Sequence, residues 1–391
     1  MARIQTVAEM RELARARVPR MFFGYVDSGS WTEGTRDRNA ADLGRILFRQ
    51  RVCRDLRDRS LATTMAGEAV AMPLAIAPTG MAGMLWPDGE VALMRAAEAA
   101  GIPYTMSTFS ISSIEQVATA ASRPFWFQLY VMRDRAFVAD LMRRAWAAGC
   151  RTLVLTLDLQ ILGQRHADVR NRLGAPPKPS LPVVAQFAAR PRWCLRMLRA
   201  KSWSYGNILG HLPDVDGLKR MAEWTAGQFE PNLGHDAIAW VRDQWQGRLI
   251  LKGILDPEDA AAATGLGADA LIVSNHGGRQ LDGASSSIAA LPGIVDAVGG
   301  RIEVHMDGGI HSGQDILRAR ALGARGVYAG RAMLYGLAAG GEAGVARVLA
   351  ILRSALDLSM AFCGHTGIDD ITPDILLDPR AAGMQQGVGR I

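Results

Sequence analysis

The sequence ALIVSNHGGRQLD at residues 270–282 joins a short apolar run to a polar, glycine-rich segment. Its first four residues are all apolar and predict a buried strand. The two glycines that follow His276 allow a sharp turn and a close approach of the backbone to a ligand. A histidine can titrate near neutral pH, and Arg279 carries a planar guanidinium that matches a carboxylate. The stretch therefore predicts a strand whose carboxyl end holds a proton acceptor beside an anion-binding cation.

Similar apolar runs recur along the chain and alternate with Ala-rich segments of helical periodicity. The candidate strands are 72–77, 103–106, 125–129, 152–157, 249–251, 270–273, 302–306 and 326–329. The candidate helices between them are 90–100, 114–121, 135–148, 257–265 and 313–322. Alternation of this kind predicts a parallel sheet. Eight such units predict a closed (β/α)₈ TIM barrel, which takes roughly 250 residues in its plain form. A doubly wound open sheet is the second interpretation, but no GxGxxG motif supports it.

The length of the chain exceeds that of a plain barrel. It has 391 residues, 49% of them hydrophobic, which is ample for one large core. We expect a single domain over 1–391 with a barrel core at about 72–355. The surplus lies in residues 1–71, which look mostly helical, and in an insertion at about 175–232 that follows the fourth strand.

Composition excludes several classes of protein. The four cysteines (Cys53, Cys150, Cys194 and Cys363) are scattered without a CxxC pair, which favours a reducing compartment and predicts neither disulfides nor a metal site. Neither a signal peptide nor a run of about 18 apolar residues is visible, so no spanning helix is expected. The formal charge of +6 is compatible with an anionic substrate, nucleic acid or a membrane surface. Because no nucleic-acid motif is present, nucleic acid is not expected as a partner.

The insertion carries an unusual stretch at residues 175–213, which contains no acidic residue. Its cations are Lys178, Arg190, Arg192, Arg196, Arg199 and Lys201, and they are interleaved with Trp193, Leu195, Met197, Leu198, Trp203 and Tyr205. Cations mixed with tryptophans and aliphatic residues are typical of an interfacial membrane anchor. A basic surface loop or a subunit contact is an equally good interpretation of the pattern alone.

The end of every predicted strand is polar, rich in glycine, or both. In a barrel, the carboxyl ends of the strands form the face that holds the active site. Because loops are polar anyway, about one or two such ends are expected by chance, and eight of eight predict a site. In chain order these residues are Pro78, Thr79 and Gly80; Ser107; Gln128 and Tyr130; Thr156 and Asp158, with Arg165 beyond; Lys252; Ser274 to Arg279; Asp307, Gly308 and Gly309; Gly330 and Arg331.

The last two strand ends indicate a phosphate site. The seventh strand ends in Asp-Gly-Gly at 307–309, just before a helix, and the eighth ends in Gly330 and Arg331. This pattern is typical of the phosphate site after strands seven and eight of a barrel, where backbone N–H groups and a helix N-terminus bind the phosphate. Lys252 has three interpretations: a Schiff-base nucleophile, a cation facing an anionic cofactor, or an ordinary strand-end residue. A phosphate site without a Rossmann motif favours a phosphorylated cofactor such as FMN.

Several motifs together resemble a known family. SNHGGRQLD (274–282), FWFQLYV (125–131), LTLD (155–158) and LKGIL (251–255) resemble the FMN-dependent α-hydroxy acid dehydrogenases and oxidases over about residues 25–371. ILDPEDA and FQLYVMRDR are similar to the branch of bacterial membrane-associated L-lactate dehydrogenases. The PTG triplet at 78–80 is shared with the mandelate dehydrogenase branch.

The resemblance implies a reaction and a location. It implies oxidation of a small L-2-hydroxy acid, L-lactate to pyruvate, with electrons passed to a membrane quinone or another respiratory acceptor. It also implies a homotetramer at the cytoplasmic face of the inner membrane, with a cytoplasmic protein as the alternative. The rival activities are an (S)-mandelate dehydrogenase and a soluble oxidase that uses oxygen and makes hydrogen peroxide. An FMN-dependent isomerase lies outside this class and would not need groups that bind a carboxylate.

The resemblance also implies roles at the substrate. His276 would be the general base and Asp158 would fix its tautomer and stabilise its charged form. The arginines would lower the pKa of His276 and Asp158 would raise it. Arg279 and Arg165 would bind the substrate carboxylate, and Tyr25 and Tyr130 would hydrogen-bond the carboxylate and the hydroxyl. Without the resemblance, Tyr25 would be interpreted as a packed helix residue and Asp158 as a helix N-cap. Phe109 and Leu162 would line the pocket for the substrate side chain, and their bulk favours methyl over phenyl.

The implied cofactor contacts are with FMN. Lys252 would sit near N1 of the isoalloxazine. The other residues assigned to FMN are Pro78, Thr79, Gly80, Ser107, Gln128, Thr156, Ser274, Asp307, Gly308, Gly309, His311, Gly330 and Arg331. Two departures from the family pattern stand out. His311 replaces a usual arginine and removes a permanent cation at the phosphate, and Gln160 and Gln164 replace other residues in the active-site loop.

Overall fold

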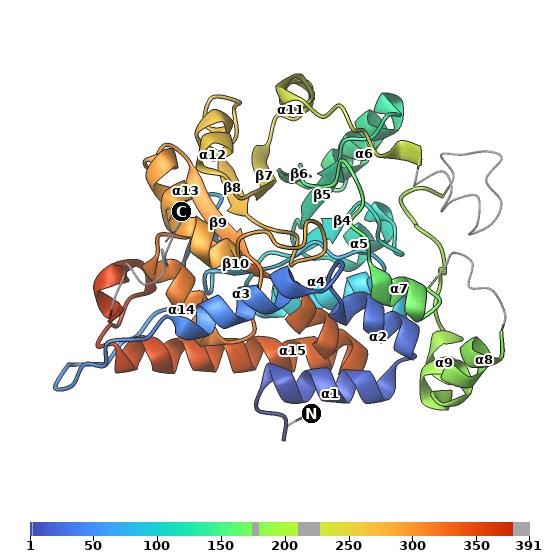
Figure 1. The fold of residues 1–391 in the computed structure, drawn as a ribbon, viewed down its shortest axis with the longest axis horizontal. Coiled ribbons are helices and arrows are strands. Elements are labelled where there is room, and N and C mark those ends of the chain that lie inside the picture. Colours follow the sequence, from blue (N-terminus) through green and yellow to red (C-terminus); the bar gives the residue numbers. More distant parts are fainter. Residues whose placement is uncertain (2, 174–179, 210–226, 378–391) are drawn as a thin grey trace, which may run out of the picture.

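The computed structural model describes residues 1, 3–173, 180–209 and 227–377. An eight-stranded parallel sheet forms the centre of the molecule, in the order β3-β10-β9-β8-β7-β6-β5-β4 (Figure 1). A parallel bridge between Ile76 and Tyr104 joins its two edges and closes the barrel. The predicted (β/α)₈ barrel is thereby confirmed. The strands are β3 (Leu74–Ile76), β4 (Thr105–Ser107), β5 (Trp126–Tyr130), β6 (Thr152–Thr156), β7 (Arg248–Ile254), β8 (Ala270–Val273), β9 (Glu303–Asp307) and β10 (Gly326–Ala329).

Each predicted strand overlaps an observed one, and β8 and β10 match residue for residue. The agreement has a physical reason. Strands of a parallel barrel are buried on both faces, so their sequences are short apolar runs bounded by turn residues. β7 is longer than predicted because Lys252 and Gly253 continue the strand, with an irregularity in its pairing to β8 at that point. Polar Lys252 therefore belongs to the barrel wall.

Helices cover the outside of the barrel. Side chains at their N-termini define several starts: Ser113 and Gln116 form a capping box on α5, as Ser312 and Asp315 do on α14. The final long helix is interrupted at Gly340–Gly341, whose dihedral angles are not helical. The elements are α4 (Gly89–Ala99), α5 (Ile114–Ala120), α6 (Arg135–Ala147), α11 (His235–Gln244), α12 (Pro257–Ala263), α13 (Ser287–Val298), α14 (Gly313–Ala321) and α15 (Arg331–Phe362), with short 3₁₀ turns η1 (Ala82–Met84), η2 (Ile368–Asp370) and η3 (Pro373–Ile375).

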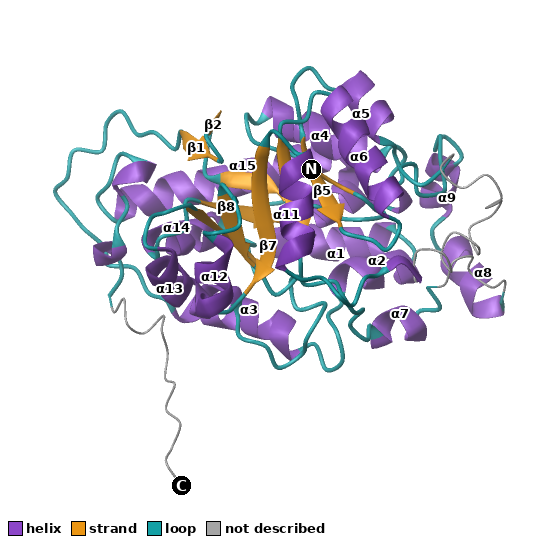
Figure 2. Ribbon diagram, turned by 90° about the horizontal axis from the view of Figure 1, so that it is seen from above, coloured by secondary structure: helices purple, strands orange, loops and turns teal. Residues whose placement is uncertain are grey.

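The segment before the barrel is only partly helical. It contains α1 (Val7–Arg17), α2 (Arg20–Asp27) and α3 (Gly34–Arg45), but residues 63–70 form an antiparallel hairpin of β1 (Thr63–Met65) and β2 (Glu68–Val70) (Figure 2). The mostly helical prediction for 1–71 is therefore wrong at this point. Met65 and Ala66 join the inner core cluster that includes Trp126 and Tyr328, so the hairpin packs into one end of the barrel.

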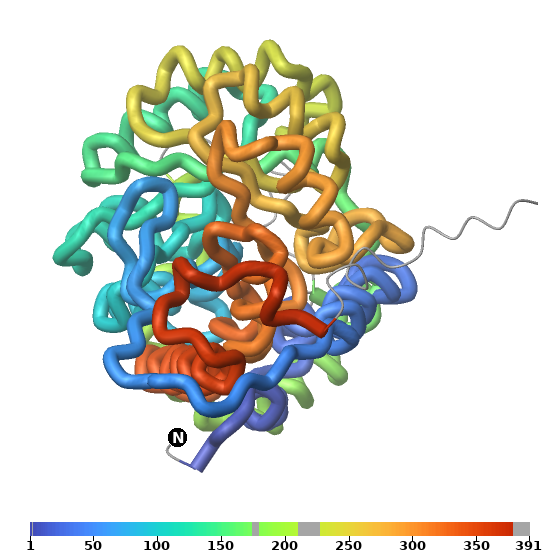
Figure 3. The backbone as a smooth tube through the Cα atoms, turned by 90° about the vertical axis from the view of Figure 1, so that its left-hand side faces the viewer, coloured from blue at the N-terminus to red at the C-terminus, as the bar shows by residue number. Residues whose placement is uncertain are grey.

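The segment that precedes the barrel lies beside the last segment of the described chain. Figure 3 shows the segment after α3 running beside the segment after α15. Bridges join Phe48 to Leu376 and Ser60 to Gly367. In the same region, α1 lies along α15 (Figure 1). These contacts hold the N-terminal helices on the barrel and bring α2 to the mouth of the site.

The insertion contributes α7 (His166–Arg170), α8 (Leu181–Ala188) and α9 (Pro191–Met197) at one side of the molecule (Figure 2). Lys178 and residues 210–226 lie outside the described ranges. Trp193 and Met197 are 2% and 1% exposed, so they are not at a membrane as predicted: Trp193 packs against Phe22 of α2, at 5.4 Å between ring centroids. Exposed apolar side chains remain at Leu181, Val184, Leu195, Leu198 and Trp203. In the described ranges, no helix is long and apolar enough to cross a bilayer.

Candidate active site

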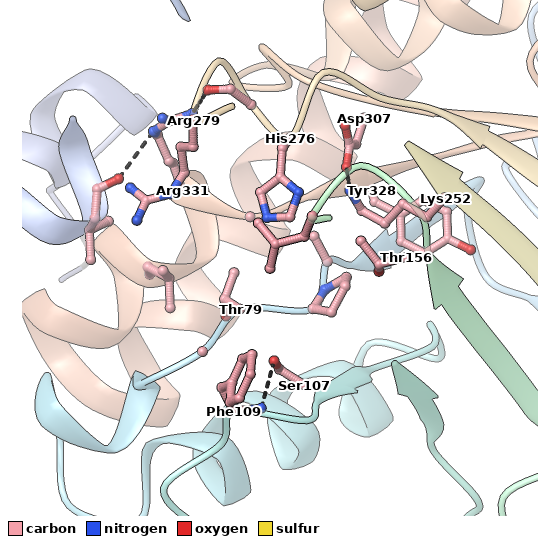
Figure 4. Close-up of a pocket in the computed structure, with 18 of the residues that line it drawn as sticks. Thr79, Ser107, Phe109, Thr156, Lys252, His276, Arg279, Asp307, Tyr328 and Arg331 are labelled. Carbon is pink, nitrogen blue, oxygen red and sulfur yellow. Dashed lines mark hydrogen bonds and ion pairs between the residues drawn. The ribbon is translucent and has the colours of Figure 1, made fainter. Parts of the chain in front are cut away.

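A cavity of about 320 Å³ lies at the carboxyl ends of the barrel strands (Figure 4). Most of the predicted site residues line it together. They are Tyr25, Pro78, Thr79, Gly80, Ser107, Phe109, Tyr130, Thr156, Leu162, Arg165, Lys252, His276, Arg279, Asp307, Gly308, Gly309, His311, Gly330 and Arg331. Segments from almost the whole chain therefore converge on one space, as the barrel prediction requires.

Three predicted residues do not line the cavity and instead hold residues that do. Asp158 Oδ1 lies 2.9 Å from Nδ1 of His276. Ser274 Oγ accepts hydrogen bonds from Lys252 Nζ at 2.7 Å and from the His276 backbone N–H at 3.1 Å. Gln128 Oε1 accepts a bond from Ser107 Oγ at 3.2 Å. In the structure, Ser274 acts on the cavity through its neighbours.

His276 has a fixed orientation. Its φ of +56° lies in the left-handed region, which is costly for a residue with a side chain. The bonds to Ser274 and Asp158 offset this cost and aim the ring at the cavity (Figure 4). Because a carboxylate only accepts hydrogen bonds, Nδ1 of His276 must carry the proton. Nε2 is then left with a lone pair, as a general base requires.

The charges around His276 favour its neutral form. Burial lowers the pKa of His276, and the Lys252 and Arg165 cations lower it further, against the opposing effect of Asp158. Burial alone would raise the pKa of Asp158, but its interaction with His276, the hydrogen bond included, and the charge of Lys252 bring it below its usual value. His276 can therefore act as a base, and the anionic Asp158 stabilises the imidazolium that forms when His276 takes a proton.

Two arginines supply unpaired positive charge opposite the base. Arg279 lies with its guanidinium 4.7 Å from the centroid of the Tyr25 ring and donates to the carbonyl oxygens of Tyr25 and Ser28. Burial and Arg165 lower the pKa of Arg279 to about 9, which leaves it protonated at neutral pH. Within the described ranges, neither guanidinium forms an ion pair with a carboxylate. A buried cation without a partner favours an anionic ligand.

Lys252 is held as a cation. It is 4% exposed, and its Nζ lies 2.9 Å from Asp307 Oδ2. Burial lowers the pKa of Lys252, but Asp307 and Asp158 outweigh this and raise it above its usual value. A Schiff-base nucleophile must be a neutral amine. The geometry therefore favours the second interpretation of Lys252, a cation facing an anionic cofactor.

The polar lining fits an FMN molecule. Thr79 Oγ1, Thr156 Oγ1, Gln128 Nε2 and Asp307 Oδ1 are buried and have no hydrogen-bond partner in the protein. Buried polar atoms of this kind are nearly always bonded, so they require a ligand with donors and acceptors. A flavin ring edge and a polyol chain supply both. Gly308 and Gly309, at φ of +93° and +83°, keep the backbone beyond Asp307 free of side chains.

The phosphate end of the cavity has one permanent cation. Arg331 begins α15 and donates to the carbonyl oxygens of Val26, Gly277 and Ser28 at 3.1, 2.7 and 2.8 Å, which uses three of its five N–H groups. Burial and the charge of Arg331 lower the pKa of His311. His311 is therefore neutral at neutral pH, and this chain offers less charge to the phosphate than an arginine at that position would.

The sequence did not reveal two aromatic residues of the lining. Tyr205 and Phe229 come from the insertion and form a wall with Phe109, at 5.6 and 6.3 Å between ring centroids. Phe109 also stacks on Tyr130 at 5.2 Å. Tyr205 belongs to residues 175–213, for which a membrane anchor was one interpretation, and it lines the cavity instead. No motif surrounds Phe229. Val26, Ala77, Met81, Leu159, Ile310, Tyr328 and Leu334 also line the cavity and were not predicted.

Comparisons with known proteins identify the family of the chain. The FMN-dependent dehydrogenase family matches residues 14–378. L-lactate dehydrogenase of Caulobacter vibrioides is 44% identical over 97% of this chain and 99% of its own length. The L-lactate dehydrogenase of Xanthomonas campestris pv. campestris is 44% identical over 95% of this chain and 97% of its own length. The crystal structure of the monotopic membrane protein (S)-mandelate dehydrogenase superposes with a TM-score of 0.92 at 38% identity, over 96% of this chain and 99% of that one. This chain belongs to the FMN-dependent dehydrogenase family.

Proposed function

We propose that this protein oxidises L-lactate to pyruvate with FMN as its cofactor. The observation that carries the proposal is the His276–Asp158 pair, bonded at 2.9 Å, in one cavity with two arginines that lack a carboxylate partner within the described ranges. Such a cavity binds an anion and removes a proton from it. The relatives named L-lactate dehydrogenase, at 44% identity over nearly the whole chain, support L-lactate as the acid.

The residues divide the work as follows. Arg279 and Arg165 bind the substrate carboxylate through paired hydrogen bonds. Tyr25 and Tyr130 bind the carboxylate and the hydroxyl. His276 Nε2 takes a proton from the substrate, and Asp158 stabilises the imidazolium that forms. The two electrons of the oxidation are accepted by FMN.

The lining residues would hold FMN as follows. Lys252, kept protonated by Asp307, places positive charge at the flavin ring. The unpartnered atoms of Thr79, Thr156 and Gln128 bind the polar edge of the ring. Asp307 Oδ1 binds the ribityl chain. Gly309, Gly330, Arg331 and a neutral His311 surround the phosphate at the start of α15.

The substrate side chain faces an aromatic wall. Phe109 stacks on Tyr130 and is flanked by Tyr205 and Phe229, and we expect this wall to leave little room for a phenyl group. A methyl group fits such a space better. (S)-Mandelate is the second candidate, since a mandelate dehydrogenase superposes at a TM-score of 0.92. Anaerobic stopped-flow reduction of the flavin distinguishes the two substrates. L-lactate should bleach the flavin faster than (S)-mandelate does, and the opposite order would refute the lactate assignment.

Truncating this wall should change the substrate preference. In the Phe109→Ala variant, we expect the ratio of kcat/KM for (S)-mandelate to that for L-lactate to rise by about tenfold or more, because the removed ring makes room for phenyl. Steady-state rates with both acids measure the ratio. The matched control is Phe362→Ala, whose ring is exposed on α15. An unchanged ratio in Phe109→Ala would show that the wall does not select the substrate.

The electron acceptor and location are parts of the same proposal. We expect a membrane quinone or another respiratory carrier to take the electrons, in a homotetramer bound to the cytoplasmic face of the inner membrane. The exposed apolar residues of α8 and α9, beside exposed Arg192 and Arg199, support attachment to an anionic surface. A soluble oxidase would not need them.

Binding to vesicles tests the attachment. The protein should sediment with anionic vesicles at low salt and less at high salt, because screening weakens the attraction of its cations. Leu195→Asp with Leu198→Asp should reduce binding strongly, whereas Leu358→Asp, on the exposed side of α15, serves as the control. If vesicles do not bind at any salt and oxygen reoxidises the flavin to give peroxide, the protein is a soluble oxidase.

A further inference from the structure

A second cavity, of about 600 Å³, lies outside the barrel between α1, α2, the start of α3 and α7. Arginines dominate its lining. Arg11 and Arg15 come from α1, Arg20 from α2, Arg36 from α3, Arg170 from α7, and Arg190 from the connection of α8 to α9. Only two carboxylates, Asp27 and Glu33, line the same space. None of the six arginines was assigned to the active site.

The carboxylates of this cavity are already occupied. Asp27 accepts two hydrogen bonds of 2.6 Å from Arg11 and one of 2.7 Å from Tyr335. Glu33 pairs with Arg36. Both acids therefore neutralise arginines on one side of the cavity and leave the other side positive. Because Asp27 is held in three bonds and Glu33 in an ion pair, both are poor competitors for the remaining cations.

Three arginines keep uncompensated charge. Within the described ranges, Arg20, Arg170 and Arg190 form no ion pair. Arg190 donates to its neighbour Ala189 and, at 3.4 Å, to the carbonyl of Arg15, but its Nε is buried without a partner. Guanidinium groups that converge without carboxylates form a site for a multiply charged or multidentate anion.

The cavity adjoins the part of the surface that the proposed function assigns to a membrane. Arg190 lies between α8 and α9, which are neighbours at one side of the molecule (Figure 1). Leu181 and Val184 on α8, Leu195 on α9 and Leu198 just after it are exposed. Apolar side chains on such helices enter the boundary between head groups and acyl chains. A cation between them then lies at the depth of the phosphates.

We propose that this cavity binds the phosphodiester head group of an anionic phospholipid. The inference rests on the proposed membrane attachment and adds a defined lipid site to it. Arg20, Arg170 and Arg190 bind the phosphate oxygens, while the aliphatic residues of α8 and α9 contact the acyl chains. The site shares α2 and α7 with the active-site cavity, since Tyr25 and Arg165 belong to or precede the same helices.

Paired variants of the FMN-loaded protein test the site. Arg170→Gln with Arg190→Gln removes two cations from the cavity, and Arg192→Gln with Arg199→Gln removes two exposed cations of the same region from outside it. Binding of phosphatidylglycerol vesicles is measured by sedimentation, and binding of soluble glycerophosphoglycerol and inorganic phosphate by calorimetry. Bleaching of the flavin by L-lactate confirms that each variant is folded.

The cavity pair, Arg170→Gln with Arg190→Gln, should lose binding of glycerophosphoglycerol. Its vesicle binding should also be weaker, by about tenfold or more, than that of the outside pair, Arg192→Gln with Arg199→Gln. Equal losses in the two pairs would show diffuse attraction and overturn the proposal. The cavity pair could instead lose only its binding of inorganic phosphate, while both pairs bind vesicles equally. That result would assign the cavity to free phosphate and would also overturn the proposal. If the unaltered protein binds no vesicle, the membrane attachment itself is wrong.

Discussion

Replacing His276 by glutamine is expected to leave the protein yellow and to slow reduction of its flavin by L-lactate by about 10²- to 10⁴-fold. Glutamine is polar and of similar length, so it can keep a bond to Asp158. It has no basic lone pair, however, and cannot take the proton of the substrate. Anaerobic stopped-flow absorbance of the flavin measures the rate, and the visible spectrum confirms that FMN is bound.

The matched control for this variant is His235→Gln, because His235 is exposed at the start of α11, away from the cavity. It should reduce its flavin at the normal rate. Near-normal bleaching in His276→Gln would remove His276 from the role of base. Loss of the flavin in that variant would be seen directly in the spectrum and calls for reconstitution with FMN before the rate is measured.

The pH profile follows from the same histidine. His276 is active when neutral, and burial with the nearby cations lowers its pKa below the usual value. As pH falls through that lowered pKa, His276 becomes protonated and kcat/KM should decline. The decline should therefore lie at a more acidic pH than that of an ordinary histidine, near 6.5. His276→Gln should lose this acidic limb.

Replacing Arg279 by methionine should lower kcat/KM for L-lactate by about 10²- to 10⁴-fold. Losing one partner of a buried, hydrogen-bonded charge pair costs about 2–5 kcal/mol. Arg279 has no carboxylate partner within the described ranges, so its charge is available to the substrate. Steady-state kinetics measure the loss, and Arg279→Lys should recover part of it by restoring charge without the planar fork.

A neutral substrate separates this role from a general disturbance of the site. Lactamide has the shape of lactate but no charge, so the unaltered protein should strongly prefer lactate. In Arg279→Met that preference should largely disappear. If both substrates lose activity equally, Arg279 acts by supporting the carbonyls of Tyr25 and Ser28 and not by binding the carboxylate.

Local patterns predicted the barrel well because each strand carries its own signal. Runs such as 270–273 are apolar over their whole length and end at a glycine or a polar residue, so their position does not depend on distant contacts. The hairpin at 63–70 lacked such a signal. Its turn is Ala66–Gly67, both at positive φ, and not one of the strongly preferred turn pairs. Contacts with distant segments stabilise it: Met65 and Ala66 pack into the barrel, and the Ala66 N–H donates to Glu303.

The site was predictable where residues follow strands and not where the insertion supplies them. His276, Lys252 and Asp307 stand at fixed points of the barrel, so their convergence follows from the fold. Tyr205 and Phe229 reach the cavity through contacts between segments far apart in sequence. The same limit explains why Trp193 was assigned to a membrane: its burial against Phe22 is a tertiary contact.

The most direct test is an anaerobic titration of the FMN-bound protein with L-lactate, followed by the flavin absorbance and the pyruvate formed. The proposed function predicts complete bleaching near one equivalent of L-lactate, with one pyruvate per FMN, and no bleaching by D-lactate. A flavin that stays oxidised in excess L-lactate, while the protein is folded and loaded with FMN, would contradict it.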